Sequence, residues 1–149
     1  MLILDTNHVT ALGYSSAPAR QLEERIAVRG QETGTTIVTV EEQVRGWLAR
    51  IHRANTDPRG LIFRYGRFWE RIEFFASWPV LPWDEEAASR FAALRLQRIC
   101  LGTMDRKIAS IVLAHDATLL TRPFDCAQGT RNSADFAQVP GLKFENRID

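Results

Sequence analysis

Short strand-like runs alternate with helix-like segments along this chain, and this alternation limits the possible folds more than any other feature. The runs at residues 1–6, 35–40 and 117–121 are rich in leucine, isoleucine, valine or threonine and have the length of strands. Because a parallel strand pair needs a crossover connection, usually a helix, this order predicts a mainly parallel sheet with helices on both faces. The expected fold class is α/β, in three layers.

The other expected elements follow from periodicity and from residues typical of helix ends. Helices are expected at residues 17–29, 41–54, 59–77, 85–98 and 104–115, and further short strands at 79–82 and 142–144. Pro58 suits the first turn of a helix, and Asp84 suits a helix cap. Gly30 and Gly34 are expected to bracket a loop. The two helices on either side of Pro58 predict a helical hairpin that protrudes from the sheet.

Length and composition indicate one globular domain. The chain has 149 residues, of which 45% are hydrophobic and 25% charged, and these values exclude disordered, fibrous and disulfide-scaffold classes. Cys100 and Cys126 lack metal-ligand spacing, which favours a reducing compartment. Asp5 interrupts the initial apolar run, and no stretch approaches the ~18 apolar residues of a membrane helix. We therefore expect a cytoplasmic protein without a membrane partner.

Basic residues are distributed unevenly, although the formal net charge is only +1. Residues 45–71 contain two acids, Asp57 and Glu70, and seven arginines: Arg45, Arg50, Arg53, Arg59, Arg64, Arg67 and Arg71. Such a segment can neutralise the phosphates of a nucleic acid. The alternative is a solvated helix surface whose arginines cover apolar neighbours.

Acidic and amide side chains are expected near the ends of the predicted strands. Asp5 closes the first strand, Glu42 lies in the first turn of the helix after the second, and Asp105 opens the helix before the third. Asn132 and Asp135 follow the third strand. Because ligands of parallel α/β sheets bind at the carboxyl ends of the strands, we expect these residues at one edge.

Each acid also has a local structural interpretation. Asp5 can cap the next helix, and Glu42 can form a capping box with Thr39. Asp105 can stabilise a helix N-terminus through its negative charge. However, several carboxylates at one edge repel one another unless a cation lies between them. Oxygen ligands of this kind suit Mg²⁺ or Mn²⁺, so the sequence favours a divalent-metal site.

Four ordered blocks resemble the PIN-domain ribonucleases, and among these the VapC toxins of bacterial type II toxin–antitoxin operons. The blocks are Leu4-Asp5-Thr6-Asn7, Thr39-Val40-Glu41-Glu42-Gln43-Val44-Arg45-Gly46, Asp105-Arg106-Lys107-Ile108-Ala109 and Asn132-Ser133-Ala134-Asp135-Phe136. The resemblance runs nearly end to end. It implies a single PIN-like domain over residues 1–149 that hydrolyses RNA phosphodiester bonds with the help of a metal ion.

The resemblance also implies a set of site residues. The catalytic acids would be Asp5, Glu42, Asp105 and Asp135. Asp5 and Asp105 would hold Mg²⁺, or Mn²⁺, directly, and the other two would hold a second ion or orient metal-bound water. Thr6 and Asn132 would support the site through hydrogen bonds to a coordinated water or to the scissile phosphate. No serine, cysteine or histidine nucleophile is needed.

An apparent insertion separates the third strand from the last block. Thr121-Arg122 recurs as Thr130-Arg131, which indicates a loop insertion at residues 123–131. If it loops out, Asn132 and Asp135 stay at the site; if Pro123 leads the chain away, Asp125 comes nearest instead. The second possibility leaves an alternative function: a catalytically impaired PIN-fold module that binds RNA or antitoxin without efficient turnover.

A third function, a receiver-like or phosphatase-like domain with Asp5 as phosphate acceptor, is disfavoured. It needs a lysine near the phosphate, and neither Lys107 nor Lys143 follows a predicted strand end. The histidines lack the spacing of metal ligands and have no assigned catalytic role: His8, His52 and His115. For His115, at a helix end, we expect a capping role.

The resemblance implies an RNA substrate, such as tRNA or another structured RNA, and a cognate antitoxin. A second copy of the chain, in a homodimer, is also an expected partner. Arg45, Arg50 and Arg53 are the candidate RNA-binding residues. The hairpin carries more aromatic side chains than one helix face buries: Trp47, Phe63, Phe68 and Trp69. These predict a partner surface, and the alternative is a place in the core of the chain itself.

Overall fold

The computed structural model describes residues 1–13, 17–54, 57–121 and 136–145. Over these residues, five strands form one sheet in the order β3-β2-β1-β4-β5, with all neighbours parallel. The strands are β1 Leu2–Leu4, β2 Thr33–Thr36, β3 Val80–Leu81, β4 Thr118–Leu120 and β5 Lys143–Glu145. The helices are α1 Thr6–Leu12, α2 Ala17–Arg29, α3 Ile37–Arg53, α4 Pro58–Ser77, α5 Glu85–Leu96 and α6 Thr103–Ala114. The predicted α/β class is confirmed.

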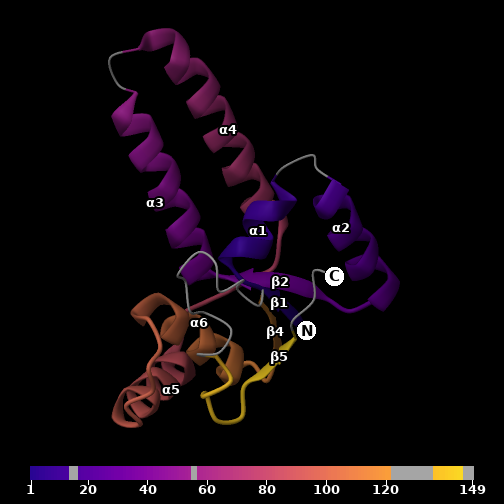
Figure 1. The fold of residues 1–149 in the computed structure, drawn as a ribbon, viewed down its shortest axis with the longest axis vertical. Coiled ribbons are helices and arrows are strands. Elements are labelled where there is room, and N and C mark those ends of the chain that lie inside the picture. The colour runs from indigo at the N-terminus through magenta and orange to yellow at the C-terminus, as the bar shows by residue number, and fades with distance from the viewer. Residues whose placement is uncertain (14–16, 55–56, 122–135, 146–149) are drawn as a thin grey trace.

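The central strand β1 shows why helices lie on both faces of the sheet (Figure 1). Its residues are all buried, and successive side chains of a strand point to opposite faces. Ile3 belongs to an apolar cluster with residues of α5 and α6, including Ala87 and Ile111. Leu2 and Leu4 belong to a second cluster, with residues of α1, α2 and α4. This apolar run is therefore buried on both faces, as the three-layer prediction requires.

The strand predicted at residues 35–40 is wrong in its position. β2 ends at Thr36, and α3 already begins at Ile37. Oγ1 of Thr36 caps this helix by accepting a hydrogen bond from the backbone N–H of Thr39 at 3.2 Å. Val38 and Thr39 are then buried in the first turn. The cap and this burial outweigh the strand preference of β-branched residues, which depends strongly on context.

The sequence predicts Gly34 at the edge of a loop, but this residue lies inside β2. A Cβ atom at this residue would lie 2.6 Å from the backbone oxygen of Pro79. The N–H of Thr35 donates a hydrogen bond to that same oxygen at 3.0 Å. Glycine therefore allows the chain that enters β3 to approach β2 closely enough to pair.

The predicted helical hairpin is present: α3 and α4 extend side by side away from the sheet (Figure 1). Asp57 caps α4 by accepting a hydrogen bond from the N–H of Arg59 at 3.2 Å, and Pro58 is the first helical residue. Phe75 is buried in the cluster that contains Leu2 and Leu4. Trp69, in contrast, is 64% exposed. Only part of the apolar surface of α4 is core.

The last two helices, α5 and α6, lie within two residues of their predicted bounds. Asp84 caps α5 by accepting a hydrogen bond from the N–H of Ala87 at 2.8 Å. His115 ends α6, and its Nε2 lies 3.4 Å from Oδ2 of Asp84. No helix in the described ranges is long and apolar enough to cross a membrane. The predicted insertion at residues 123–131 lies outside these ranges.

Candidate functional site

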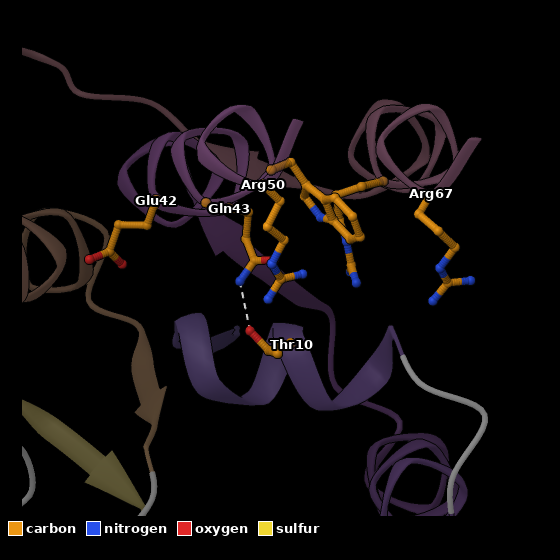
Figure 2. A pocket seen from close by; sticks show the side chains of 8 residues that line it. Thr10, Glu42, Gln43, Arg50 and Arg67 are labelled. Atoms are coloured by element: carbon orange, nitrogen blue, oxygen red, sulfur yellow. Dashed lines mark hydrogen bonds between the residues drawn. The ribbon is translucent and has the colours of Figure 1, made fainter. Parts of the chain in front are cut away.

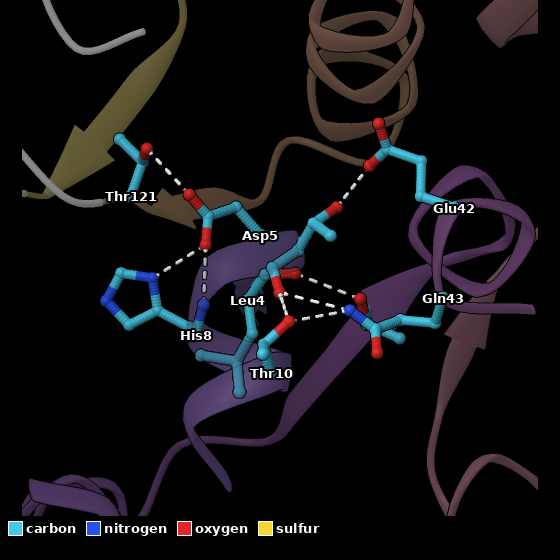
Figure 3. Close-up of polar contacts among 9 residues, drawn as sticks. Leu4, Asp5, His8, Thr10, Glu42, Gln43 and Thr121 are labelled. Carbon is cyan, nitrogen blue, oxygen red and sulfur yellow. Dashed lines mark hydrogen bonds and ion pairs between the residues drawn. The ribbon is translucent and has the colours of Figure 1, made fainter. Parts of the chain in front are cut away.

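Asp5 lies at the carboxyl end of β1 and is only 6% exposed (Figure 3). Its Oδ1 accepts two hydrogen bonds from His8, one from the backbone N–H at 2.9 Å and one from ring Nδ1 at 2.7 Å. Its Oδ2 accepts a hydrogen bond from Oγ1 of Thr121 at 2.8 Å. Asp5 is therefore the N-cap of α1, as its local interpretation predicted, and its carboxylate is also held from the end of β4.

Glu42 lies in the second turn of α3, because that helix begins earlier than the sequence indicated. Its Oε2 accepts a hydrogen bond from Oγ1 of Thr6. The predicted capping box of Thr39 and Glu42 is wrong, because the cap of α3 is Thr36 and Thr39 lies within the helix. The carboxylate of Glu42 instead points towards α1, where it contacts Thr6, the residue that follows Asp5 (Figure 3).

A second polar contact ties α3 to α1. Nε2 of Gln43 donates a hydrogen bond to Oγ1 of Thr10 at 2.7 Å, and it lies 3.4 Å from the backbone oxygen of Thr6. Both helices start at the carboxyl ends of neighbouring strands, β1 and β2. These bonds thus hold Asp5 and Glu42 on the same edge of the sheet.

Asp105 lies in the first turn of α6 and is partly buried. A Cβ atom on the N-cap residue, Gly102, would lie 3.3 Å from Oδ2 of Asp105. The carboxylate is thus beside the helix N-terminus, where a negative charge is favourable. Asn132 and Asp135 lie outside the described residues, so the structure places neither.

The carboxylates of Asp5, Glu42 and Asp105 are hard oxygen donors, the ligand type that Mg²⁺ and Mn²⁺ prefer. The donor chemistry of the predicted metal site therefore fits such an ion. Among the described residues, however, no group of three or more His, Cys, Asp or Glu side chains is placed to hold one. The predicted metal site stays a prediction that also requires Asp135.

The candidate RNA-binding arginines lie on the exposed surface of α3. Arg45 forms an ion pair with Glu41 one turn earlier. The guanidinium of Arg50 lies 4.7 Å from the ring centroid of Trp47, a cation–π contact. Nε of Arg53 donates to a backbone oxygen one turn earlier at 3.3 Å. These contacts are local, and they leave the guanidinium groups at the surface.

A pocket of about 80 Å³ lies between α1, α3 and α4 (Figure 2). Its lining is polar and charged except at one glycine and one tryptophan: Thr10, Glu42, Gln43, Gly46, Trp47, Arg50, Arg67 and Arg71. Arg67 donates to the backbone oxygen of Gly13 at 2.9 Å, and Arg71 donates to that of Val9 at 3.3 Å. Because carbonyl groups near a helix C-terminus carry partial negative charge, these two arginines stabilise the end of α1.

Comparison with solved structures gives the fold. The described architecture is similar to VapBC2 from Rickettsia felis bound to a promoter DNA fragment, with a TM-score of 0.69, 16% identity and 98% of each chain covered. The chain has the PIN-domain fold of VapC. DNA-bound VapBC from Salmonella typhimurium matches this PIN fold with a TM-score of 0.68 and 18% identity, covering 97% of this chain and 96% of the other.

A third solved structure has a similar fold. VapBC-1 from nontypeable Haemophilus influenzae has a TM-score of 0.68 and 17% identity, with 97% of this chain and 96% of that chain covered. No family model and no curated protein matches the sequence. The PIN-like three-layer sandwich implied by the four blocks is therefore confirmed by structural similarity.

Three residues at this edge of the PIN fold were not predicted as site residues: His8, Gln43 and Thr121. His8 follows Asp5 by three residues, the spacing at which a helix N-cap meets the first turn, and that spacing was a usable signal. Thr121 carried no signal, because its bond to Asp5 depends on how β4 pairs with β1.

Proposed function

We propose that this chain is a metal-dependent endoribonuclease that acts as the toxin component of a toxin–antitoxin pair. The observation that carries the proposal is the carboxylate of Asp5, buried at the carboxyl end of β1 with both oxygens held by neighbouring donors. The fold supports the same proposal, because structures described as VapBC complexes share it.

The proposed roles follow the resemblance of the four blocks. Asp5 and Asp105 hold Mg²⁺ or Mn²⁺, Glu42 and Asp135 hold a second ion or orient water, and Thr6 and Asn132 supply hydrogen bonds. A bound ion would lower the pKa of its water ligand and stabilise negative charge on the phosphate. In the described part of the chain, Thr121 and His8 form hydrogen bonds with the carboxylate of Asp5, and Thr6 donates one to that of Glu42.

We also propose that α3 contacts the substrate, tRNA or another structured RNA. Arg45, Arg50 and Arg53 are exposed on a helix that begins at the same sheet edge as the acids. Contacts of arginine with phosphates position a nucleic acid without reading its sequence. Replacing each arginine by glutamine should weaken RNA binding and reduce its salt dependence by about one unit of the log–log slope per lost phosphate contact.

The proposed protein partners are a cognate antitoxin and a second copy of the chain, within the cytoplasm. The matched structures are described as VapBC assemblies, a toxin–antitoxin arrangement. The outer part of α4 supports such an interface, because Ile62, Phe63 and Trp69 are exposed by 75%, 69% and 64%. Large exposed apolar side chains in one region are typical of partner surfaces.

The test is RNA cleavage by the purified chain with Mg²⁺, with Mn²⁺ and with EDTA. Asp5→Asn and Asp105→Asn should each abolish cleavage, because each removes a proposed metal ligand. The matched control is Asp84→Asn, because Asp84 also caps a helix through an i+3 N–H but lies against the opposite end of α6 from Asp105. Cleavage that continues in EDTA would contradict the proposal.

The second candidate is the PIN-fold module that binds RNA or antitoxin without efficient turnover. It rests on the apparent insertion at residues 123–131, which directly precedes Asn132 and Asp135 in the sequence. RNA binding without cleavage at saturating Mn²⁺ would support it. A variant that lacks residues 123–131 separates the two candidates further, because recovery of cleavage on deletion would show that the insertion impairs the site.

A further inference from the structure

His8 is completely buried in the first turn of α1 and has no role in the proposed chemistry. Its ring Nδ1 lies 2.7 Å from Oδ1 of Asp5. Its other ring nitrogen, Nε2, is also buried and has no hydrogen-bond partner among the residues that the structure describes. A buried polar atom without a partner is destabilising, so an apolar side chain would fill this space at lower cost. The Nδ1 contact is therefore the feature that distinguishes a histidine here.

The direction of this hydrogen bond follows from its partner. An ionised carboxylate only accepts hydrogen bonds, so the proton of the contact is on Nδ1 of His8. The backbone N–H of His8 donates to the same oxygen, Oδ1 of Asp5, at 2.9 Å. A carboxylate offers about two acceptor sites on each oxygen. His8 thus occupies both acceptor sites of Oδ1 through two separate donors.

The other oxygen of Asp5, Oδ2, has a different hydrogen-bond partner. Oδ2 accepts one described hydrogen bond, from Oγ1 of Thr121 at 2.8 Å. Together the donors on α1 and after the end of β4 fix the orientation of the carboxylate group, and the described donors leave one acceptor site on Oδ2. In Figure 3, Thr121 and His8 lie on one side of Asp5, and Glu42 lies on the opposite side.

We propose that His8 is a positioning residue for the carboxylate of Asp5: it saturates Oδ1 and leaves Oδ2 as the oxygen that meets a divalent cation. This inference rests on the proposed metal-dependent function. Partners of ligating groups fix ligand orientation, and their loss typically lowers metal affinity by about 10- to 100-fold.

The experiment measures Mn²⁺ affinity of the full chain by calorimetry, alongside its RNA cleavage and thermal stability. His8→Leu removes the ring donor at similar volume and should weaken Mn²⁺ binding by about 10- to 100-fold. His8→Asn keeps a side-chain N–H near the place of Nδ1 and should restore most of the affinity. If His8→Leu does not fold, His8→Ala carries the same expectation, because it also lacks the donor.

Two controls separate positioning from packing. Val9→Ala changes a neighbouring, fully buried side chain of α1, so it should lower thermal stability and leave Mn²⁺ affinity unchanged. In an Asp5→Asn background, His8→Leu should cause no further loss of Mn²⁺ affinity. Wild-type Mn²⁺ affinity in His8→Leu, with only reduced stability, would overturn the positioning role alone. A wild-type chain that binds no Mn²⁺ would overturn this role together with the proposed metal-dependent function.

Discussion

Oγ1 of Thr121 donates a hydrogen bond to Oδ2 of Asp5 at 2.8 Å, across a separation of 116 residues in the chain. The two residues directly follow β4 and β1, which pair in parallel with Leu4 opposite Leu120. Both residues are buried, with exposed fractions of 1% for Thr121 and 6% for Asp5. The register of two central strands therefore brings a hydroxyl donor to the carboxylate of the candidate site.

Thr121→Val should destabilise the protein by about 1–3 kcal/mol, because it removes a hydrogen bond from a buried carboxylate without changing the side-chain shape. Equilibrium unfolding in urea measures this loss. Thr118→Val makes the same chemical change at the other end of β4 and is the matched control. Equal effects of the two substitutions would contradict a specific contribution of the Thr121–Asp5 bond.

Gly13→Ala should also destabilise the protein, by about 1–3 kcal/mol, because a Cβ atom there would overlap Nη2 of the buried Arg71. Gly46→Ala is the control: nothing lies within 4 Å of a Cβ at this helical position, so it should stabilise α3 by up to about 1 kcal/mol. In an Arg71→Met background, the cost of Gly13→Ala should fall. A cost that stays the same would show that the overlap with Arg71 is not its cause.

Glu42→Gln should lower metal-dependent RNA cleavage by about tenfold or more while leaving stability nearly unchanged. The amide oxygen of glutamine still accepts the hydrogen bond of Thr6, but the negative charge is lost. Glu41→Gln is the control on the next residue, which is exposed and pairs with Arg45. Cleavage rates and melting temperatures of the two variants test this, and a larger loss of cleavage in Glu41→Gln would contradict the assignment.

The exposed ion pair of Asp116 and Lys143 should make stability depend on acid pH. Lys143 Nζ lies 2.7 Å from Asp116 Oδ1, and its hydrogen bond and charge lower the pKa of Asp116 below its ordinary value of 3.8. The stabilising contribution is therefore present above about pH 4 and is lost as the pH falls through the lowered pKa.

Asp116→Asn tests this, because asparagine tolerates the positive φ of 47° at this residue. The variant should melt slightly below the wild type at neutral pH, and the difference should disappear in strong acid. The effect is small, since both side chains are largely exposed. A difference that persists unchanged at low pH would contradict a charge-based contribution.

Serine substitutions on the outer part of α4 should weaken assembly and leave folding intact. Ile62→Ser and Trp69→Ser remove side chains that are 75% and 64% exposed, so they lose little core packing. Light scattering of the chain alone and with its antitoxin measures the assembly. Leu96→Ser, at an 84% exposed position on α5, is the matched control. A wild-type chain that is strictly monomeric and binds no antitoxin would contradict this interface.

Local signals were sufficient for most of the elements. Asp57-Pro58 and Asp84 mark the starts of α4 and α5 because a cap is a contact between residues that are close in the chain. The segment at residues 35–40 was misassigned because its β-branched residues have a strand preference that capping and burial overrule. That competition involves the packing of α3 on the rest of the fold, which no local pattern contains.

The candidate site also combines features that the sequence indicates with features that only the folded chain fixes. The sequence by itself indicated that Asp5 and Glu42 come after successive strands of a mainly parallel sheet, and a parallel sheet places such residues on one edge for topological reasons. Only the tertiary structure decided which groups hold them: Thr121 and His8 on Asp5, and Thr6 on Glu42. Hydrogen bonds require donor and acceptor to meet within about 3 Å. Strand register and helix packing bring these atoms together, and both are properties of the folded chain.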